Sequence, residues 1–309
     1  MDKKHFYRVG GQSGAWDVLP TDPDELDTLT NSARKHIEPW LSAVFQAEHL
    51  NLLLGSGFTT AVGCIAGVGA TGMAKVTFGT TYDAAIDAHA QAGATAMKRG
   101  AANIEDQFRS ALALLDGLGV IDNAAEQTLK DAIDVQMSGF LTSLLKTESG
   151  IVAGKDLTSK DAAQGALQSL LLSFASRAAS RERLHVFTTN YDRLIEHGCD
   201  LAGLRIIDRF VGALNPVFRA SRVEVDVHYN PPGIRGEPRF MEGVIRLTKL
   251  HGSLDWFFDK DERRIYRKGI PFGAPAGHTD IPKKPVDTVM IYPNPAKDVE
   301  TTQYPYAEL

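Results

Sequence analysis

Three apolar runs along the chain each end in a short polar segment, and together they predict strands of one sheet. In order, the runs and the segments that follow them are Leu52–Leu54 before Gly55-Ser56-Gly57, Leu184–Phe187 before Thr188-Thr189-Asn190-Tyr191-Asp192, and Val244–Leu250 before His251-Gly252. Continuous apolar runs are typical of strands that are buried on both faces of a parallel sheet. In open parallel sheets, ligands bind in the crevice outside the carboxyl ends of the strands. The pattern therefore predicts that a glycine-rich turn, an asparagine–aspartate pair and a histidine meet at one pocket.

Apolar residues at helical spacing predict a helix before the first strand. Residues 1 to about 28 are rich in Gly, Asp and Pro, which favours an irregular arm. From Thr30 to Glu48 the apolar residues recur three and four positions apart, so we expect a helix that leads into the strand.

The long stretch from residue 80 to residue 182 shows helical patterns but no strand pattern. Asn103 with Asp106 is typical of a helix N-cap, and apolar residues at helical spacing follow it in three groups, Phe108–Leu115, Leu129–Leu144 and Leu167–Phe174. A crossover between parallel strands needs only about 10–12 residues. We therefore predict a helical subdomain that is inserted into an α/β core.

The remaining patterns complete the predicted fold. A helix is expected at Tyr191–Leu201, a strand at Leu204–Ile207 and a last strand at Val289–Tyr292. Between Arg209 and Phe240 the prolines predict a loop that holds at most a short hairpin. The fold class is thus α/β, a Rossmann-like parallel sheet with a large inserted helical subdomain, and residues 29–309 form one domain.

The composition limits the kinds of ligand and the cell compartment that we expect for this fold. The apolar share of 43% and the charged share of 23% are ordinary for a soluble globular protein. A net charge of -5 gives no basic surface of the kind that binds nucleic acid, so an anionic ligand needs a local cradle. Two cysteines, Cys64 and Cys199, supply neither a disulfide framework nor a four-cysteine zinc site. The chain shows no signal-peptide core and no membrane span, so we expect a metal-free protein of the cytoplasm.

Each of the three polar segments can be explained either by a role in the fold or by a role in ligand binding or catalysis. Gly55 and Gly57 let backbone approach a phosphate at a helix N-terminus, but a glycine pair also suits a tight turn without a ligand. Asp192 stands where a helix N-cap is required, whereas Asn190 at the end of an apolar strand can present its amide to the crevice. His251 is a candidate general base at the end of its strand, although a lone histidine is often structural.

In their order and context, the polar segments resemble the signature blocks of the sirtuin superfamily. The matching residues are Gly55-Ser56-Gly57, Thr189-Asn190-Tyr191-Asp192 and Lys249-Leu250-His251-Gly252-Ser253. Within the superfamily the chain is most similar to the sirtuin-like NAD-cleaving proteins of bacterial anti-phage defence, which share blocks at residues 103–106, 187–192, 250–256 and 291–293. The resemblance spans residues 50 to 293, and its second and third blocks are specific whereas the glycine block is not.

This resemblance implies a reaction and a role for each matching residue. The reaction is NAD glycohydrolysis, in which NAD is the substrate and no metal takes part. Asn190 matches the asparagine that holds the reacting ribose and water, and His251 matches the general base. The residues assigned to NAD binding are Gly55, Ser56 and Gly57 of the phosphate turn, together with Thr59, Thr189 and Asp192, the last as a ribose-side or site-supporting acid.

Two departures separate the chain from the protein deacylases of that superfamily. It lacks the two Cys-x-x-Cys pairs of their structural zinc, and it lacks an Ile-Pro-Asp-Phe-Arg-like segment after Gly63. A deacylase or ADP-ribosyltransferase acting at the same site, and a non-catalytic NAD or ADP-ribose sensor, are the alternatives. The chain also ends at Leu309, before the segment that closes the adenosine side in relatives, so we expect a continuation or a differently built adenosine side.

The predicted activity also implies control. A constitutive NAD hydrolase would drain its own cell, so we expect it to stay nearly silent until a signal arrives. The insertion at residues 80–182 can cover the pocket and contact a neighbour, and its several apolar faces indicate a homo-oligomer. The resemblance further implies a second defence protein as partner, such as a translocase-type ATPase. Direct contact with nucleic acid or membrane is not expected.

Overall fold

The structure is a computed structural model of the chain, which divides into two units, residues 1–50 and residues 51–309. The described residues are 6–7, 17–70, 72–121, 123–222, 225–230, 236, 239–259, 261–275, 277–278, 280–281, 289–290, 305 and 307. The parallel sheet and the cavity at its edge belong to the second unit.

One long helix dominates the described part of the first unit. α1 (Pro23–Phe45) begins where the side chain of Asp22 accepts hydrogen bonds from the N–H groups of Asp24 (3.0 Å) and Glu25 (3.1 Å). This cap starts the helix before the predicted Thr30, so that the helix takes in part of the stretch predicted as an arm. Ahead of it, β1 (Phe6–Tyr7) pairs antiparallel with β2 (Asp17–Val18).

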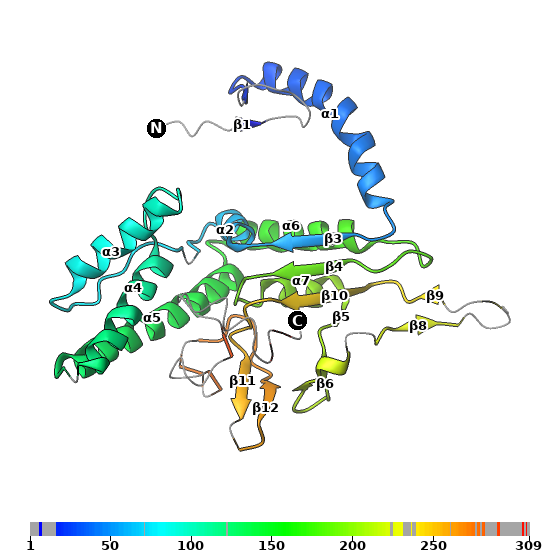
Figure 1. The fold of residues 1–309 in the computed structure, drawn as a ribbon. Coiled ribbons are helices and arrows are strands. Elements are labelled where there is room, and N and C mark those ends of the chain that lie inside the picture. Colours follow the sequence, from blue (N-terminus) through cyan, green and yellow to red (C-terminus); the bar gives the residue numbers. More distant parts are fainter. Residues whose placement is uncertain are drawn as a thin grey trace. The chain divides into compact units, whose positions relative to one another are not determined.

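Four parallel strands form the central sheet of the second unit, in the order β3–β4–β10–β5 (Figure 1). They are β3 (Asn51–Leu54), β4 (His185–Thr188), β10 (Val244–Lys249) and β5 (Arg205–Ile207), each within one residue of its predicted bounds. The register pairs Leu54 with Thr188 and Thr188 with Lys249. Because three strands end at the same level, the segments that carry the candidate site residues leave the sheet side by side.

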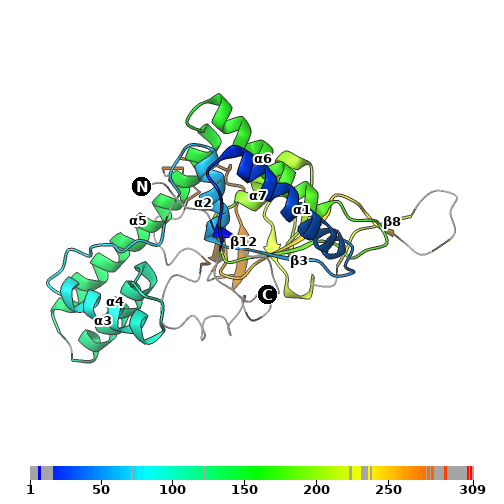
Figure 2. The same ribbon diagram turned by 90° about the horizontal axis from the view of Figure 1, so that it is seen from above.

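Helices α2 (Ser56–Ile65), α6 (Leu157–Ala175) and α7 (Leu194–Ala202) cover one face of this sheet (Figures 1 and 2). α6 packs closely on α7 at Gly198, where a β-carbon would lie 2.6 Å from Leu171 and 2.7 Å from Leu167. α7 begins at Leu194 rather than at the predicted Tyr191. Its N-cap is Arg193, which makes no side-chain cap, and Asp192 just before it accepts the N–H of Leu194 (3.1 Å). The α/β class with a Rossmann-like core is confirmed.

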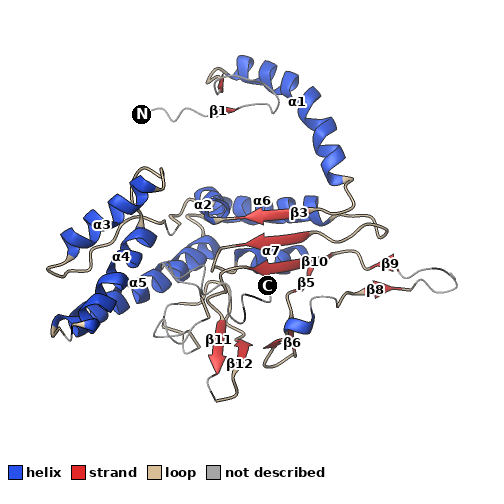
Figure 3. Ribbon diagram, viewed as in Figure 1, coloured by secondary structure: helices blue, strands red, loops and turns tan. Residues whose placement is uncertain are grey.

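Three further helices precede α6 in the stretch predicted as an insertion (Figure 3). They are α3 (Asp83–Ala96), α4 (Ile104–Val120) and α5 (Ala125–Ala153), and α3 packs on α4 while α4 packs on α5. α5 also contacts α2 and α6. Their shared core includes Phe108 and Phe140 and extends without interruption to Tyr191, directly after β4. The inserted helices therefore reach the carboxyl edge of the sheet.

A second, antiparallel sheet was not apparent in the apolar pattern. It consists of β11 (Trp256–Asp259), β12 (Arg264–Arg267), β7 (Val217–Phe218) and β6 (Phe210–Val211) in that order. Trp256 fills its core, with its ring centroid 5.0 Å from Phe210 and 6.2 Å from Phe218. Trp256 is thus a packing residue, whereas the nearby Phe258 is 42% exposed.

Short elements account for the rest of the described chain. η1 (Ala220–Arg222) is a single 3-10 turn, and β8 (His228–Tyr229) pairs antiparallel with β9 (Arg239–Phe240) inside the stretch where a short hairpin was predicted. Of the strand predicted at Val289–Tyr292, Met290 makes one bridge to Gly252, and Ile291 and Tyr292 lie outside the described residues. Within the described ranges, no helix combines the length and the apolar character that a bilayer crossing needs.

Candidate functional site

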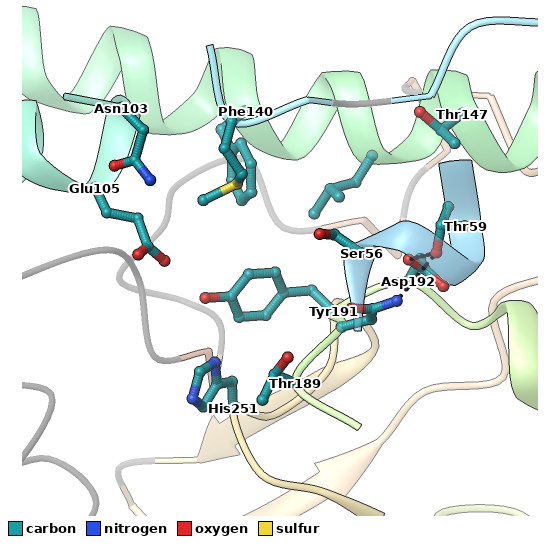
Figure 4. Close-up of a pocket in the computed structure, with 13 residues that line it drawn as sticks. Ser56, Thr59, Asn103, Glu105, Phe140, Thr147, Thr189, Tyr191, Asp192 and His251 are labelled. Atoms are coloured by element: carbon teal, nitrogen blue, oxygen red, sulfur yellow. Dashed lines mark hydrogen bonds between the residues drawn. The ribbon is translucent and has the colours of Figure 1, made fainter. Parts of the chain in front are cut away.

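The carboxyl ends of the central strands open into a cavity of about 250 Å³ (Figure 4). Six of the eight residues predicted for the site line it, namely Ser56, Thr59, Thr189, Asn190, Asp192 and His251. Gly55 contacts this group through its carbonyl oxygen, which accepts a hydrogen bond from Asn190 Nδ2 (3.0 Å). Gly57 lies in the first turn of α2 and does not line the cavity. The three segments that are far apart in sequence therefore meet, as the strand pattern predicts.

The side chain of Asn190 is held in one orientation. It is 8% exposed, and its Nδ2 donates to Gly55 O (3.0 Å) and to Thr59 Oγ1 (3.0 Å). Because a backbone carbonyl can only accept, the amide nitrogen and not the oxygen must face Gly55. With both amide protons engaged, Oδ1 is the atom through which Asn190 can accept a hydrogen bond from a ligand hydroxyl or a water.

Asp192 also lines the cavity, and its side chain holds Thr59 in place. Its Oδ2 accepts the hydroxyl proton of Thr59 (2.8 Å), and its Oδ1 accepts the N–H of Leu194 at the start of α7 (3.1 Å). Asp192 is therefore not the N-cap that the sequence suggested: that position is held by Arg193, and Asp192 accepts the N–H of Leu194 from the residue before it. In addition, the chain of hydrogen bonds from Asp192 through Thr59 to Asn190 links the turn after β4 to α2, so Asp192 also fixes the site.

Buried charges anchor the turn after β4 from two directions. Lys249 at the end of β10 donates through Nζ to the backbone oxygen of Asp192 and to Glu196 Oε1 (2.9 Å). Arg193 meets Glu148 of α5 through its backbone N–H (2.8 Å) and its guanidinium (2.6 Å). Glu148 is 1% exposed, so this ion pair is buried and ties an inserted helix to the turn that carries Asn190.

His251 follows β10 and faces the cavity from the opposite segment. Leu250 continues the sheet by donating its N–H to Thr188 O (2.8 Å). Gly252 then adopts a left-handed conformation with a φ of 78°, which a residue with a side chain seldom adopts. This turn presents the imidazole to the cavity, where its ring centroid lies 6.2 Å from that of Tyr191.

The glycine turn after β3 has open space around its α-carbons. A β-carbon at Gly55 or at Gly57 would meet no other heavy atom within 4 Å, so packing inside the chain does not require glycine at either position. Gly55 is the N-cap of α2 and supplies no capping side chain to the first turn of that helix. The first-turn N–H groups of a helix without a side-chain cap are suited to an anion such as phosphate.

The far wall of the cavity comes from residues that the sequence did not assign to the site. α4 and its preceding residue contribute Glu105 and Asn103, and α5 contributes Phe140, Leu144 and Thr147. Met73 and Tyr191 complete this wall. The N-cap pattern at Asn103 placed the start of α4 correctly, but nothing in the sequence shows that this helix end meets β4 and β10. That contact depends on how α3, α4 and α5 pack.

Two other candidates for chemistry lie outside the cavity. Burial raises the pKa of the Cys199 thiol to about 12, so this cysteine is not a ready nucleophile. Burial, followed by the nearby charges of Arg246 and Arg209, lowers the pKa of His185 to about 4 and keeps this imidazole neutral at physiological pH. Among the described residues, no group of three or more His, Cys, Asp or Glu side chains is arranged to hold a metal ion.

Comparisons with known proteins assign no family to the chain. No protein-family model matches it, and no curated protein matches its sequence. The functional conclusion therefore depends on the cavity and on the residues around it.

Proposed function

We propose that this protein is a sirtuin-like NAD glycohydrolase, which converts NAD and water into ADP-ribose and nicotinamide. One observation supports it above all: Asn190 and His251, from segments far apart in sequence, line the same cavity beside the uncapped start of α2. Phosphate, ribose and a water would each find a matching group there. The proposed reaction requires no metal ion and no cluster of acidic residues.

The volume of the cavity suits a part of NAD rather than the whole molecule. Its volume of about 250 Å³ lies below the range of about 300–1,000 Å³ that is common for whole drug-sized ligands. Its wall combines the apolar side chains of Met73, Phe140 and Leu144 with the polar groups of Asn190 and His251. We therefore assign the cavity to the nicotinamide ribose, with the pyrophosphate at the start of α2.

The chemistry follows from the leaving group. The bond between nicotinamide and ribose breaks with its electron pair moving to the ring nitrogen, which leaves an oxocarbenium-like ribose. The oriented Asn190 would hold a ribose hydroxyl or the attacking water through Oδ1. His251 would accept the proton that water releases as its oxygen bonds to the anomeric carbon. The products are ADP-ribose, neutral nicotinamide and one proton.

The biological setting is part of the same proposal. An enzyme that hydrolyses NAD depletes a metabolite on which its own cell depends, and this suits anti-phage defence in the cytoplasm under tight control. We propose a homo-oligomer whose activity depends on a trigger and on a partner such as a translocase-type ATPase. The helices α3, α4 and α5 are the elements through which such control can act, since α4 begins at the cavity and α5 lines it.

Product analysis tests the reaction type. NAD labelled in its adenine is incubated with the purified protein, with and without a phage lysate as trigger and with an acetylated peptide as acceptor. Hydrolysis predicts ADP-ribose and nicotinamide in equal amounts whether or not the peptide is present. Peptide deacetylation or peptide-linked ADP-ribose would assign a deacylase or a transferase, and bound but intact NAD would assign a sensor.

A further inference from the structure

The wall of the cavity that α4 contributes carries a carboxylate. Glu105 lies in the first turn of α4 and lines the cavity. Figure 4 shows its carboxylate directed into the cavity, on the side where the hydroxyl group of Tyr191 and the ring of His251 lie. The inserted helices thus supply a charged group to a site whose other segments come from the sheet.

The start of α4 is fixed, so the position of Glu105 is defined by the fold. Asn103 and Asp106 form a capping box, in which each side chain accepts the N–H of the other residue at 3.1 Å. Asp106 is fully buried and pairs with Arg99 and Arg109. Residues on both sides of Glu105 are therefore anchored, and the residue between them points to the cavity.

Asp192 also brings a carboxylate to the cavity, but both of its oxygens accept hydrogen bonds from within the chain. One of its oxygens accepts from Thr59 and the other accepts from the N–H of Leu194. An Asp192 carboxylate that turned toward a substrate would leave the start of α7 and the Thr59 hydroxyl without these bonds. Asp192 is therefore committed to the turn after β4, whereas the carboxylate of Glu105 enters the cavity from the α4 wall.

We infer that Glu105 is a further catalytic residue, whose carboxylate contacts the nicotinamide ribose and stabilises the positive charge that develops at its anomeric carbon. This inference rests on the proposed NAD hydrolysis. As the bond to nicotinamide breaks, its electron pair leaves with the ring and the ribose becomes cationic. A fixed negative charge inside a partly closed cavity lowers the energy of that state more than the energy of the ground state. Glu105 exchanges no proton and forms no covalent bond.

The variant Glu105→Gln tests this role because it keeps the shape of the side chain and removes its charge. We expect kcat to fall by about 100-fold or more, the scale of losing one preorganised electrostatic group, while NAD binding measured by calorimetry stays unchanged. Glu105→Asp keeps the charge and should recover part of the loss. Asp116→Asn is the matched control, since it removes one exposed charge from the same helix and should leave kcat unchanged.

The outcomes separate this role from the proposed reaction. A folded Glu105→Gln protein that turns over NAD at the wild-type rate overturns the role of Glu105, while NAD hydrolysis by the wild type stands. A Glu105→Gln protein that melts at a markedly lower temperature, or that loses NAD binding along with turnover, shows a structural or binding role and also overturns it. A wild-type protein that never cleaves NAD, with or without trigger, refutes both the reaction and the role.

Discussion

At the scale of residues, the site is a network in which most polar groups already have partners inside the protein. Asn190, Thr59 and Asp192 hold one another, and only the outward atoms of this network face the cavity. The strand-end pattern predicted this group because polar residues after buried apolar runs must collect at one edge of a parallel sheet. Glu105 was not predicted as a site residue, although it stands in the 103–106 block, since only the packing of helices distant in sequence brings its side chain to that edge. Tyr191 was not assigned a role either, although it lies between Asn190 and Asp192.

Thr59 is the residue on which this network depends. Thr59→Val keeps the shape of the side chain but removes the donor to Asp192 Oδ2 (2.8 Å) and the acceptor for Asn190 Nδ2 (3.0 Å). Asp192 Oδ2 then lacks this donor and Asn190 Nδ2 keeps only its bond to Gly55 O, so we expect the free energy of unfolding to fall by about 1–3 kcal/mol and turnover to drop because Asn190 is held less firmly. Urea denaturation and an NAD assay measure the two effects.

The adjacent threonine provides the control for this substitution. Thr60 is exposed and donates only along its own helix, to Ser56 O (3.1 Å). Thr60→Val should therefore change both quantities little. Equal losses of stability in the two variants would show that the bonds of Thr59 do not hold the site together.

At the scale of elements, strands were easier to predict than helix starts. A buried strand shows itself as an apolar run, and all four strands of the central sheet agree with prediction within one residue. Helix starts depend on single residues: α1 begins early, at Pro23 after the Asp22 cap, and α7 begins late, at Leu194, where Asp192 accepts the first N–H. The strands of the second sheet are two to four residues long, and the two longest, β11 and β12, include charged residues, so that no continuous apolar run of the predicted kind marks this sheet.

The buried ion pair between Glu148 and Arg193 should be the main tether between α5 and the turn after β4. Glu148→Gln leaves a guanidinium that is 6% exposed without its counter-charge. Loss of one partner from a buried pair costs about 3–5 kcal/mol, so we expect a large drop in the free energy of unfolding on denaturation. As a control, Glu262→Gln removes half of an exposed pair with Arg264 and should cost at most about 1 kcal/mol. Similar losses in both variants would contradict this tether.

At the scale of the whole molecule, the inserted helices leave large apolar side chains in solvent. Val120 is 85% exposed, Ile121 is 67% exposed and Val135 is 65% exposed. Exposed apolar side chains of this size are suited to contact with another protein surface. This distribution is consistent with the oligomer that the apolar pattern of the insertion predicts.

We therefore expect a multimer in sedimentation, and we expect Val120→Asp combined with Val135→Asp to shift it toward the monomer without unfolding the chain. Leu214→Asp is the control, because Leu214 is 93% exposed but lies outside the insertion. A wild-type protein that sediments as a stable monomer and turns over NAD at full rate without any partner would rule out this form of control.

The most direct test of the account is the rate of NAD cleavage by Asn190→Ala and His251→Ala beside the wild type. The exposed residues Asn215 and His36 provide matched controls as Asn215→Ala and His36→Ala. We predict that each site variant folds and loses at least about 100-fold in turnover, the scale of a positioned acid–base or orienting group, whereas the controls keep the wild-type rate. A folded Asn190→Ala or His251→Ala protein with near wild-type turnover would contradict the account.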